Sequence, residues 1–85
     1  MNHTIKSKNI LILGGSGMLG DAACRFFGKH KANVFAVSRS ATLCEGEFIK
    51  SIRLESYDVI KISDILIREN IDVVLICVGT PSLEN

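Results

Sequence analysis

Residues 9–13 form a short apolar run that leads directly into three glycines, Gly14, Gly17 and Gly20. A glycine directly after a strand permits a tight turn into a helix, because its backbone reaches conformations that a Cβ atom forbids. Apolar residues then recur at helical spacing over residues 18–29, and a second apolar run follows at residues 33–38. This order predicts the first strand, helix and strand of a parallel α/β sheet.

The same turn suits a negatively charged ligand. In the segment G-x-x-G-x-x-G, one glycine makes the turn, the next leaves room for a pyrophosphate beside the backbone, and the third lets the helix pack on the strand. The unpaired N–H groups at the start of the helix then face the phosphates, and the hydroxyl of Ser16 adds a donor. The alternative is a tight turn that holds no ligand. The strands and helix around the glycines favour a nucleotide-binding fold.

The rest of the chain continues this alternation of strands and helices. We expect strands at 9–13, 33–38, 49–54 and 72–78, helices at 17–29 and 59–69, a loop at 39–48 and a tail at 79–85. The strand segments at 9–13, 33–38 and 72–78 consist mainly of continuous apolar runs, as in a parallel sheet covered on both faces. Right-handed crossovers then give the strand order 3-2-1-4, an incomplete doubly wound, Rossmann-like α/β sheet. Its fourth strand would be an apolar, unprotected edge.

The end of the second strand indicates which dinucleotide would fit. Sites of this kind bind the adenosine ribose there, and a carboxylate at that point repels a 2′-phosphate. This chain has Ser38, Arg39 and Ser40 instead, with no acid before Glu45. The guanidinium of Arg39 is a planar, charged group suited to a phosphate, and the Ser38 hydroxyl is an additional donor. The residues favour NADP over NAD; the alternative is a solvated arginine in a loop.

Composition excludes several other classes of function. The chain of 85 residues is 47% apolar and 22% charged, which predicts one small globular domain. A net charge of +1 argues against binding to nucleic acid or a membrane surface, and no apolar run reaches transmembrane length. Three cysteines without metal-ligand or disulfide spacing fit a reducing cytoplasm, and the polar N-terminus does not resemble a signal peptide. We expect a cytoplasmic protein that binds a dinucleotide and no metal.

Together, the glycine segment, Ser38-Arg39 and residues 71–79 (IDVVLICVG) resemble the extended short-chain dehydrogenase/reductases. Over residues 8–80 the chain is most similar to the N-terminal part of the dTDP-4-dehydrorhamnose reductase-type sugar-nucleotide reductases. That family carries D-x-x-D after its third strand, where this chain has Glu55 and Asp58, and the resemblance implies an adenine contact for Glu55. The cofactor-binding residues implied by the glycine motif and the resemblance are Gly14, Ser16, Gly17, Met18, Leu19, Gly20, Ser38, Arg39, Glu55, Val78 and Gly79.

The catalytic Tyr-x-x-x-Lys pair of this family has no counterpart at the corresponding place. Tyr57 and Lys61 match its spacing, but they follow the third strand, whereas the family pair lies well after the fourth. We therefore assign no catalytic residue. We expect residues 1–85 to be the NADP(H)-binding N-terminal part of a reductase or epimerase of nucleotide-linked sugars, truncated after the fourth strand and inactive without a missing C-terminal substrate-binding part. The alternative is a stand-alone, non-catalytic nucleotide-binding or regulatory module that docks on a partner chain through its fourth strand.

Overall fold

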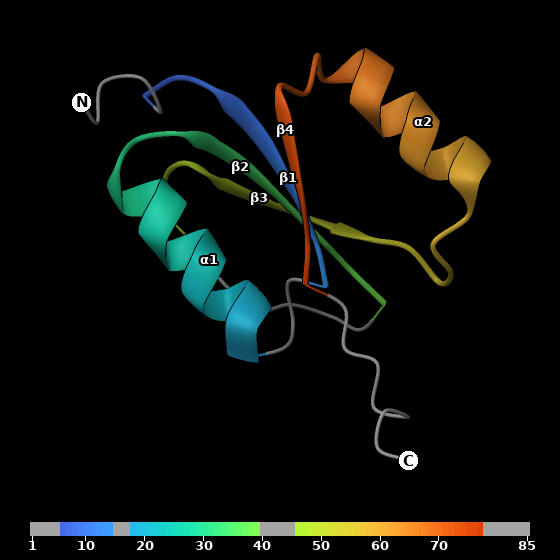
Figure 1. Ribbon diagram of the computed structural model, residues 1–85, viewed down its shortest axis with the longest axis horizontal. Coiled ribbons are helices and arrows are strands. Elements are labelled where there is room, and N and C mark those ends of the chain that lie inside the picture. Colours follow the sequence, from blue (N-terminus) through green and yellow to red (C-terminus); the bar gives the residue numbers. More distant parts are fainter. Residues whose placement is uncertain (1–5, 15–17, 40–45, 78–85) are drawn as a thin grey trace.

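The computed structural model describes residues 6–14, 18–39 and 46–77 as a parallel sheet with a helix on each face (Figure 1). The sheet has four strands in the order β3-β2-β1-β4, and all neighbouring strands are parallel. The elements in chain order are β1 (Asn9–Leu13), α1 (Met18–Lys29), β2 (Asn33–Ser38), β3 (Ile49–Arg53), α2 (Val59–Arg68) and β4 (Val73–Ile76). The predicted Rossmann-like strand order 3-2-1-4 is therefore confirmed.

The two central strands are buried on both faces of the sheet. On one face, Ile10 and Ile12 of β1 pack with Cys24 of α1. On the other face, Leu11 and Leu13 pack with Ile65 of α2. The continuous apolar runs of β1 and β2 follow from this arrangement, because every side chain in them meets a helix or a neighbouring strand.

Only some of the apolar residues of helix α1 pack on the sheet. Gly20 and Cys24 are buried, and Phe27 packs on the same core, so residues at i, i+4 and i+7 meet the sheet. The small side chains at the first two positions allow close approach of the helix. The remaining large apolar side chains of α1 are exposed, and these are Met18, Leu19 and Phe26.

Helix α2 packs on the sheet with one apolar side. Ile65 is buried, and Ile62 and Leu66 pack against the same core. The side chain of Asp58 caps the helix, since its Oδ1 accepts a hydrogen bond of 2.8 Å from the N–H of Ile60. Neither α1 nor α2 is long and apolar enough to cross a lipid bilayer.

The predicted bounds of β1 and β2 are confirmed, whereas β3, α2 and β4 are shorter than predicted. The described residues just outside these elements still make backbone hydrogen bonds, as Leu54 does to Ser38 O and Glu69 to Ile65 O, whereas residue 78 lies outside the described residues. Asn70 follows α2 with φ of 56°, which ends the helix. Beside β4, the N–H of Asp72 still donates to Asn9 O at 2.7 Å and that of Cys77 to Leu13 O at 2.8 Å.

The predicted loop at 39–48 is described only at its two ends. Residues 46–48 form a turn in which the N–H of Ile49 donates to the carbonyl of Gly46 at 3.2 Å. Residues 40–45, including Cys44, and the predicted tail at 79–85 lie outside the described residues. Cys24 is buried, and Cys77, which follows β4, is partly buried.

Candidate functional site

Three backbone hydrogen bonds join the carboxyl ends of the strands at one edge of the sheet. The N–H of Gly14 donates to Val37 O at 2.8 Å, that of Leu54 to Ser38 O at 3.0 Å, and that of Cys77 to Leu13 O at 2.8 Å. In open α/β sheets, ligands bind outside the carboxyl ends of the strands, next to the point where the strand order reverses. The residues that follow β1, β2 and β3 therefore share the edge where such a ligand would bind.

Gly14 makes the turn at the end of β1. Its φ is 87°, a backbone conformation that residues with a Cβ atom rarely adopt, and the residue is buried. Within four residues the chain has left the strand at Leu13 and begun α1 at Met18. This supports the role predicted for the first glycine of the motif. Ser16 and Gly17 lie outside the described residues.

The residues predicted to select the cofactor lie beside this turn. Ser38 is the last residue of β2 and is 3% exposed, and Arg39 follows it as an exposed residue. Because Val37 accepts the hydrogen bond from Gly14, the next two residues of the chain, Ser38 and Arg39, lie next to the glycine turn. The structure thus places the glycine turn, Ser38 and Arg39 at the same edge of the sheet.

A second arginine, which the sequence analysis did not identify, lies at the same edge. Arg53 is the last residue of β3 and the register partner of Ser38. Its Nε donates to the carbonyl oxygen of Arg39 at 3.5 Å. What places Arg53 at this edge is the register between β2 and β3, which the sequence alone does not give.

The other predicted site residues are spread around this edge. Met18 and Leu19 open α1 with exposed side chains, and Gly20 is buried against the sheet. Glu55 is exposed, two residues beyond Arg53. Val78 and Gly79 lie outside the described residues.

Tyr57 and Lys61, which match the spacing of a catalytic pair, take different places. The side chain of Tyr57 is partly buried against the core on the α2 face of the sheet. Lys61 is exposed on α2. Tyr57 and Lys61 thus lie on the α2 side of the sheet, Tyr57 as part of the core packing.

The chemistry of this edge fits a phosphorylated ligand. A glycine at positive φ allows close approach of the backbone, and Arg39 and Arg53 add two positive charges. The ion pairs among residues 6–14, 18–39 and 46–77 join Asp21 to Arg25 and Arg68 to Asp64 and Glu69, and none of them includes Arg39 or Arg53. Within the described part of the chain, the positive charge at this edge is therefore not neutralised by a carboxylate.

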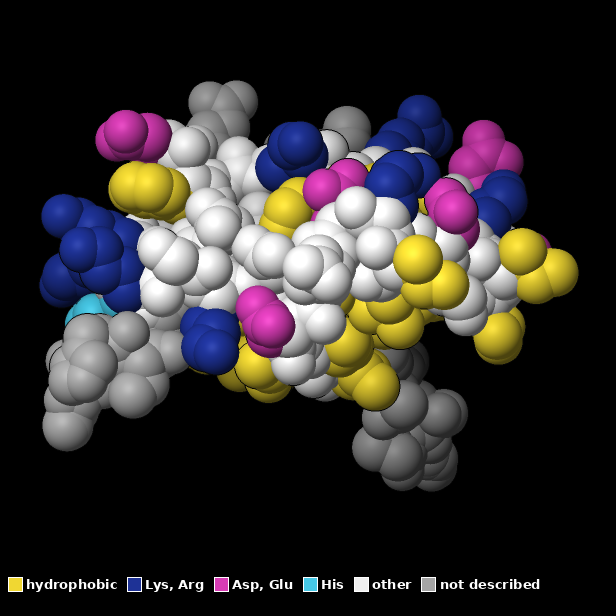
Figure 2. All heavy atoms as spheres, turned by 90° about the horizontal axis from the view of Figure 1, so that it is seen from above, with side chains coloured by type: hydrophobic (Ala, Val, Ile, Leu, Met, Phe, Trp, Pro, Cys, Tyr) yellow, Lys and Arg dark blue, Asp and Glu magenta, His cyan; other side chains and the backbone are white. Residues whose placement is uncertain are grey.

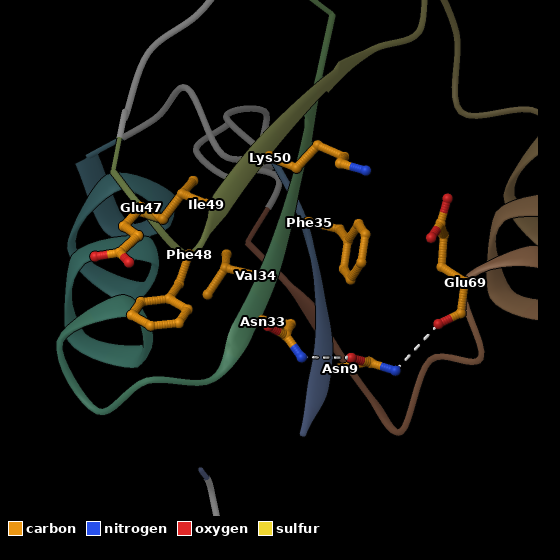
Figure 3. A pocket seen from close by; sticks show the side chains of 9 residues that line it. All are labelled: Asn9, Asn33, Val34, Phe35, Glu47, Phe48, Ile49, Lys50 and Glu69. Atoms are coloured by element: carbon orange, nitrogen blue, oxygen red, sulfur yellow. Dashed lines mark hydrogen bonds between the residues drawn. The ribbon is translucent and has the colours of Figure 1, made fainter. Parts of the chain in front are cut away.

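The opposite, amino-terminal edge of the sheet holds a polar cluster and an open hollow of about 420 Å³ (Figure 3). The side-chain amide of Asn9 donates to the carbonyl of Glu69 at 3.2 Å and to that of Asn70 at 3.1 Å, and its oxygen accepts from Asn33 at 3.0 Å. These bonds fasten the start of β1 to β2 and to the end of α2. The hollow is separated from the glycine turn by the length of the strands.

The fold and the edge at Gly14 together define a Rossmann-like α/β protein with the features of a dinucleotide site. A profile of the NAD dependent epimerase/dehydratase family matches residues 10–85. The chain therefore belongs to this family, and so to the extended short-chain dehydrogenase/reductases. Membership in an NAD-dependent family supports a nicotinamide dinucleotide as the cofactor. No curated protein sequence matches the chain.

A solved structure has the same arrangement of elements. It is the epimerase Mth375 from the thermophilic, pseudomurein-containing methanogen Methanothermobacter thermautotrophicus, with a TM-score of 0.78 and 20% sequence identity. The similarity covers 93% of this chain and 25% of the epimerase chain. At this identity the likeness establishes the fold, and the chain spans a quarter of the length of that protein.

Proposed function

We propose that residues 1–85 form the NADP(H)-binding N-terminal part of a short-chain reductase or epimerase that acts on a nucleotide-linked sugar. The observation that carries the proposal is the hydrogen bond between Gly14 and Val37, which sets a glycine turn at positive φ beside Ser38 and Arg39. Membership in the epimerase/dehydratase family supports the reaction class. The segment from Gly14 to Gly20 supports a sugar-nucleotide reductase of the dTDP-4-dehydrorhamnose reductase type.

The preference for NADP is argued from charge. An acid at the end of the second strand would bind the ribose hydroxyls of NAD and repel a 2′-phosphate, and this chain has Ser38 and Arg39 there. A guanidinium donates parallel hydrogen bonds to phosphate oxygens, which a neutral ribose does not offer. Arg39 is exposed directly after β2, so its side chain is accessible to a cofactor.

Calorimetric titration of the 85-residue chain with NADPH and NADH tests this proposal, with circular dichroism to confirm folding. We expect NADPH to bind roughly tenfold or more tightly than NADH, because charged hydrogen bonds contribute about 1.5–3 kcal/mol. Arg39→Ala should remove the preference for NADPH, and Gly17→Val should weaken the binding of both dinucleotides. Arg25→Ala, which removes the same charge from the outer part of α1, is the matched control. A folded chain that binds neither dinucleotide overturns the proposal.

A second candidate function is a non-catalytic nucleotide-binding module that docks through β4. The observation that favours it is the exposure of Val73, Val74 and Ile76 on this edge strand. The two functions differ in what the coding sequence after residue 85 specifies. A Tyr-x-x-x-Lys pair on a later helix would support the enzyme, and a stop codon directly after residue 85 would support the module.

A further inference from the structure

Arg53 lies at the same edge of the sheet as Gly14, Ser38 and Arg39. β3 directs Ile52 into the core on the α2 face, while Ser51 and Arg53 alternate to the α1 face and are exposed there. Arg53 pairs with Ser38, so its side chain emerges at the carboxyl end of β2. It is the residue of β3 nearest to the segment that would select the cofactor.

The side chain of Arg53 reaches the backbone of Arg39. Its Nε donates to the carbonyl oxygen of Arg39, with 3.5 Å between the two atoms. A guanidinium has five N–H donors, so this bond leaves both Nη groups available for another acceptor. Arg53 therefore contacts the backbone of Arg39 and also presents hydrogen-bond donors at the same edge.

The charges at this edge favour a ligand that carries more than one negative charge. Arg39 and Arg53 form no ion pair with a carboxylate of the described residues, although Glu55 lies only two residues beyond Arg53. A phosphomonoester carries about −1.5 to −2 charges at neutral pH and has three acceptor oxygens. Two arginines on neighbouring strand ends match such a group better than one arginine does.

We propose that Arg53 is a second specificity-determining residue, which binds the 2′-phosphate of NADP together with Arg39. Its Nε would also position the backbone of Arg39. This inference rests on the proposed function, because it assigns a residue to the same cofactor site. It differs from a purely structural role for Arg53, which would affect every adenine nucleotide equally. It also predicts that an arginine is needed, since lysine has the charge but lacks the planar set of donors.

The test compares two fragments of the cofactors, 2′,5′-ADP and 5′-AMP, by calorimetry on the 85-residue chain. We expect Arg53→Ala to lower the affinity for 2′,5′-ADP roughly tenfold or more, and the affinity for 5′-AMP less than twofold. Arg53→Lys should fall between the wild type and the alanine variant. Arg25→Ala controls for the loss of one positive charge, and urea unfolding of each variant reports any change in stability.

Each result decides between the two proposals. If the wild type prefers 2′,5′-ADP through Arg39 and Arg53→Ala leaves this preference intact, the role of Arg53 is wrong and the proposed function stands. An equal loss of both fragments in Arg53→Ala would show a structural role and also overturn the inference. If the wild type binds the two fragments equally, or binds neither, the NADP-binding function fails, and the role of Arg53 fails with it.

Discussion

Gly14 has a backbone conformation that makes the turn after β1 dependent on glycine. Its φ of 87° lies in a region where an L-residue with a Cβ atom is strained by about 1–2 kcal/mol. We expect Gly14→Ala to lower the free energy of unfolding by at least this amount, because the residue is also buried. Urea denaturation followed by circular dichroism measures the change.

A D-alanine at position 14 distinguishes two causes of the expected loss of stability, backbone strain and lack of space for a methyl group. It adds the same methyl group, but it favours positive φ, as the mirror image of L-alanine. A chain made by chemical synthesis with D-alanine at this position should be more stable than Gly14→Ala. Equal destabilisation by the two residues would show that space, and not φ, requires the glycine.

Asn9 is the residue whose side chain joins the most elements at the amino-terminal edge. It bonds to the end of α2 through two carbonyls and to Asn33 of β2 through its oxygen (Figure 3). At about 0.5–1.5 kcal/mol per hydrogen bond, we expect Asn9→Ala to lower the free energy of unfolding by about 2 kcal/mol. Asn33→Ala should have a smaller effect, and the double variant should be less destabilised than the sum of the two. Additive effects in urea denaturation would contradict this coupling.

At the scale of elements, the start of α2 is fixed by its N-cap residue, Asp58. Asp58, with φ of −75° and ψ of 131°, accepts the N–H of Ile60 at 2.8 Å. We expect Asp58→Ala to destabilise the chain by about 1 kcal/mol in urea, as N-cap substitutions do. Asp64→Ala on the same helix removes an exposed ion pair with Arg68 and should lower stability by no more than about 0.5 kcal/mol. Equal effects would show that the cap does not hold the helix.

The sequence predicted elements better than it predicted their contacts. The apolar runs of β1 and β2, residues 10–13 and 34–37, are flanked by asparagine, glycine or serine, so the bounds of these strands were visible, and the crossover rule gave the strand order. The face of α1 was not visible, because apolar residues occupy more than one side of this helix and packing selects the side with Gly20 and Cys24. Arg53 was missed because its place at the site depends on pairing with Ser38, a contact between residues distant in the sequence.

On the scale of the whole molecule, α2 and β4 carry several exposed apolar side chains, in addition to those of α1. Figure 2 shows hydrophobic side chains along the lower and right-hand parts of the view, and its right-hand part is the side on which α2 lies in Figure 1. Exposed residues of α2 include Ile60 and Ile67, and those of β4 include Val74 and Ile76. In the described sheet β4 pairs with β1 alone, so its other side is an edge. An apolar edge strand of this kind is a template for pairing with another chain.

We therefore expect the 85-residue chain to associate through β4 as its concentration rises. Ile76→Lys places a charge on the edge strand at a side chain that is 68% exposed, so it should weaken association roughly tenfold or more while leaving the core intact. Ile67→Lys, at a side chain that is 81% exposed on α2, is the matched control and should weaken association less, because it leaves the strand edge unchanged. Sedimentation velocity over a range of concentrations measures both variants. A monomeric wild type, or equal effects of the two lysines, would show that the edge of β4 does not drive association.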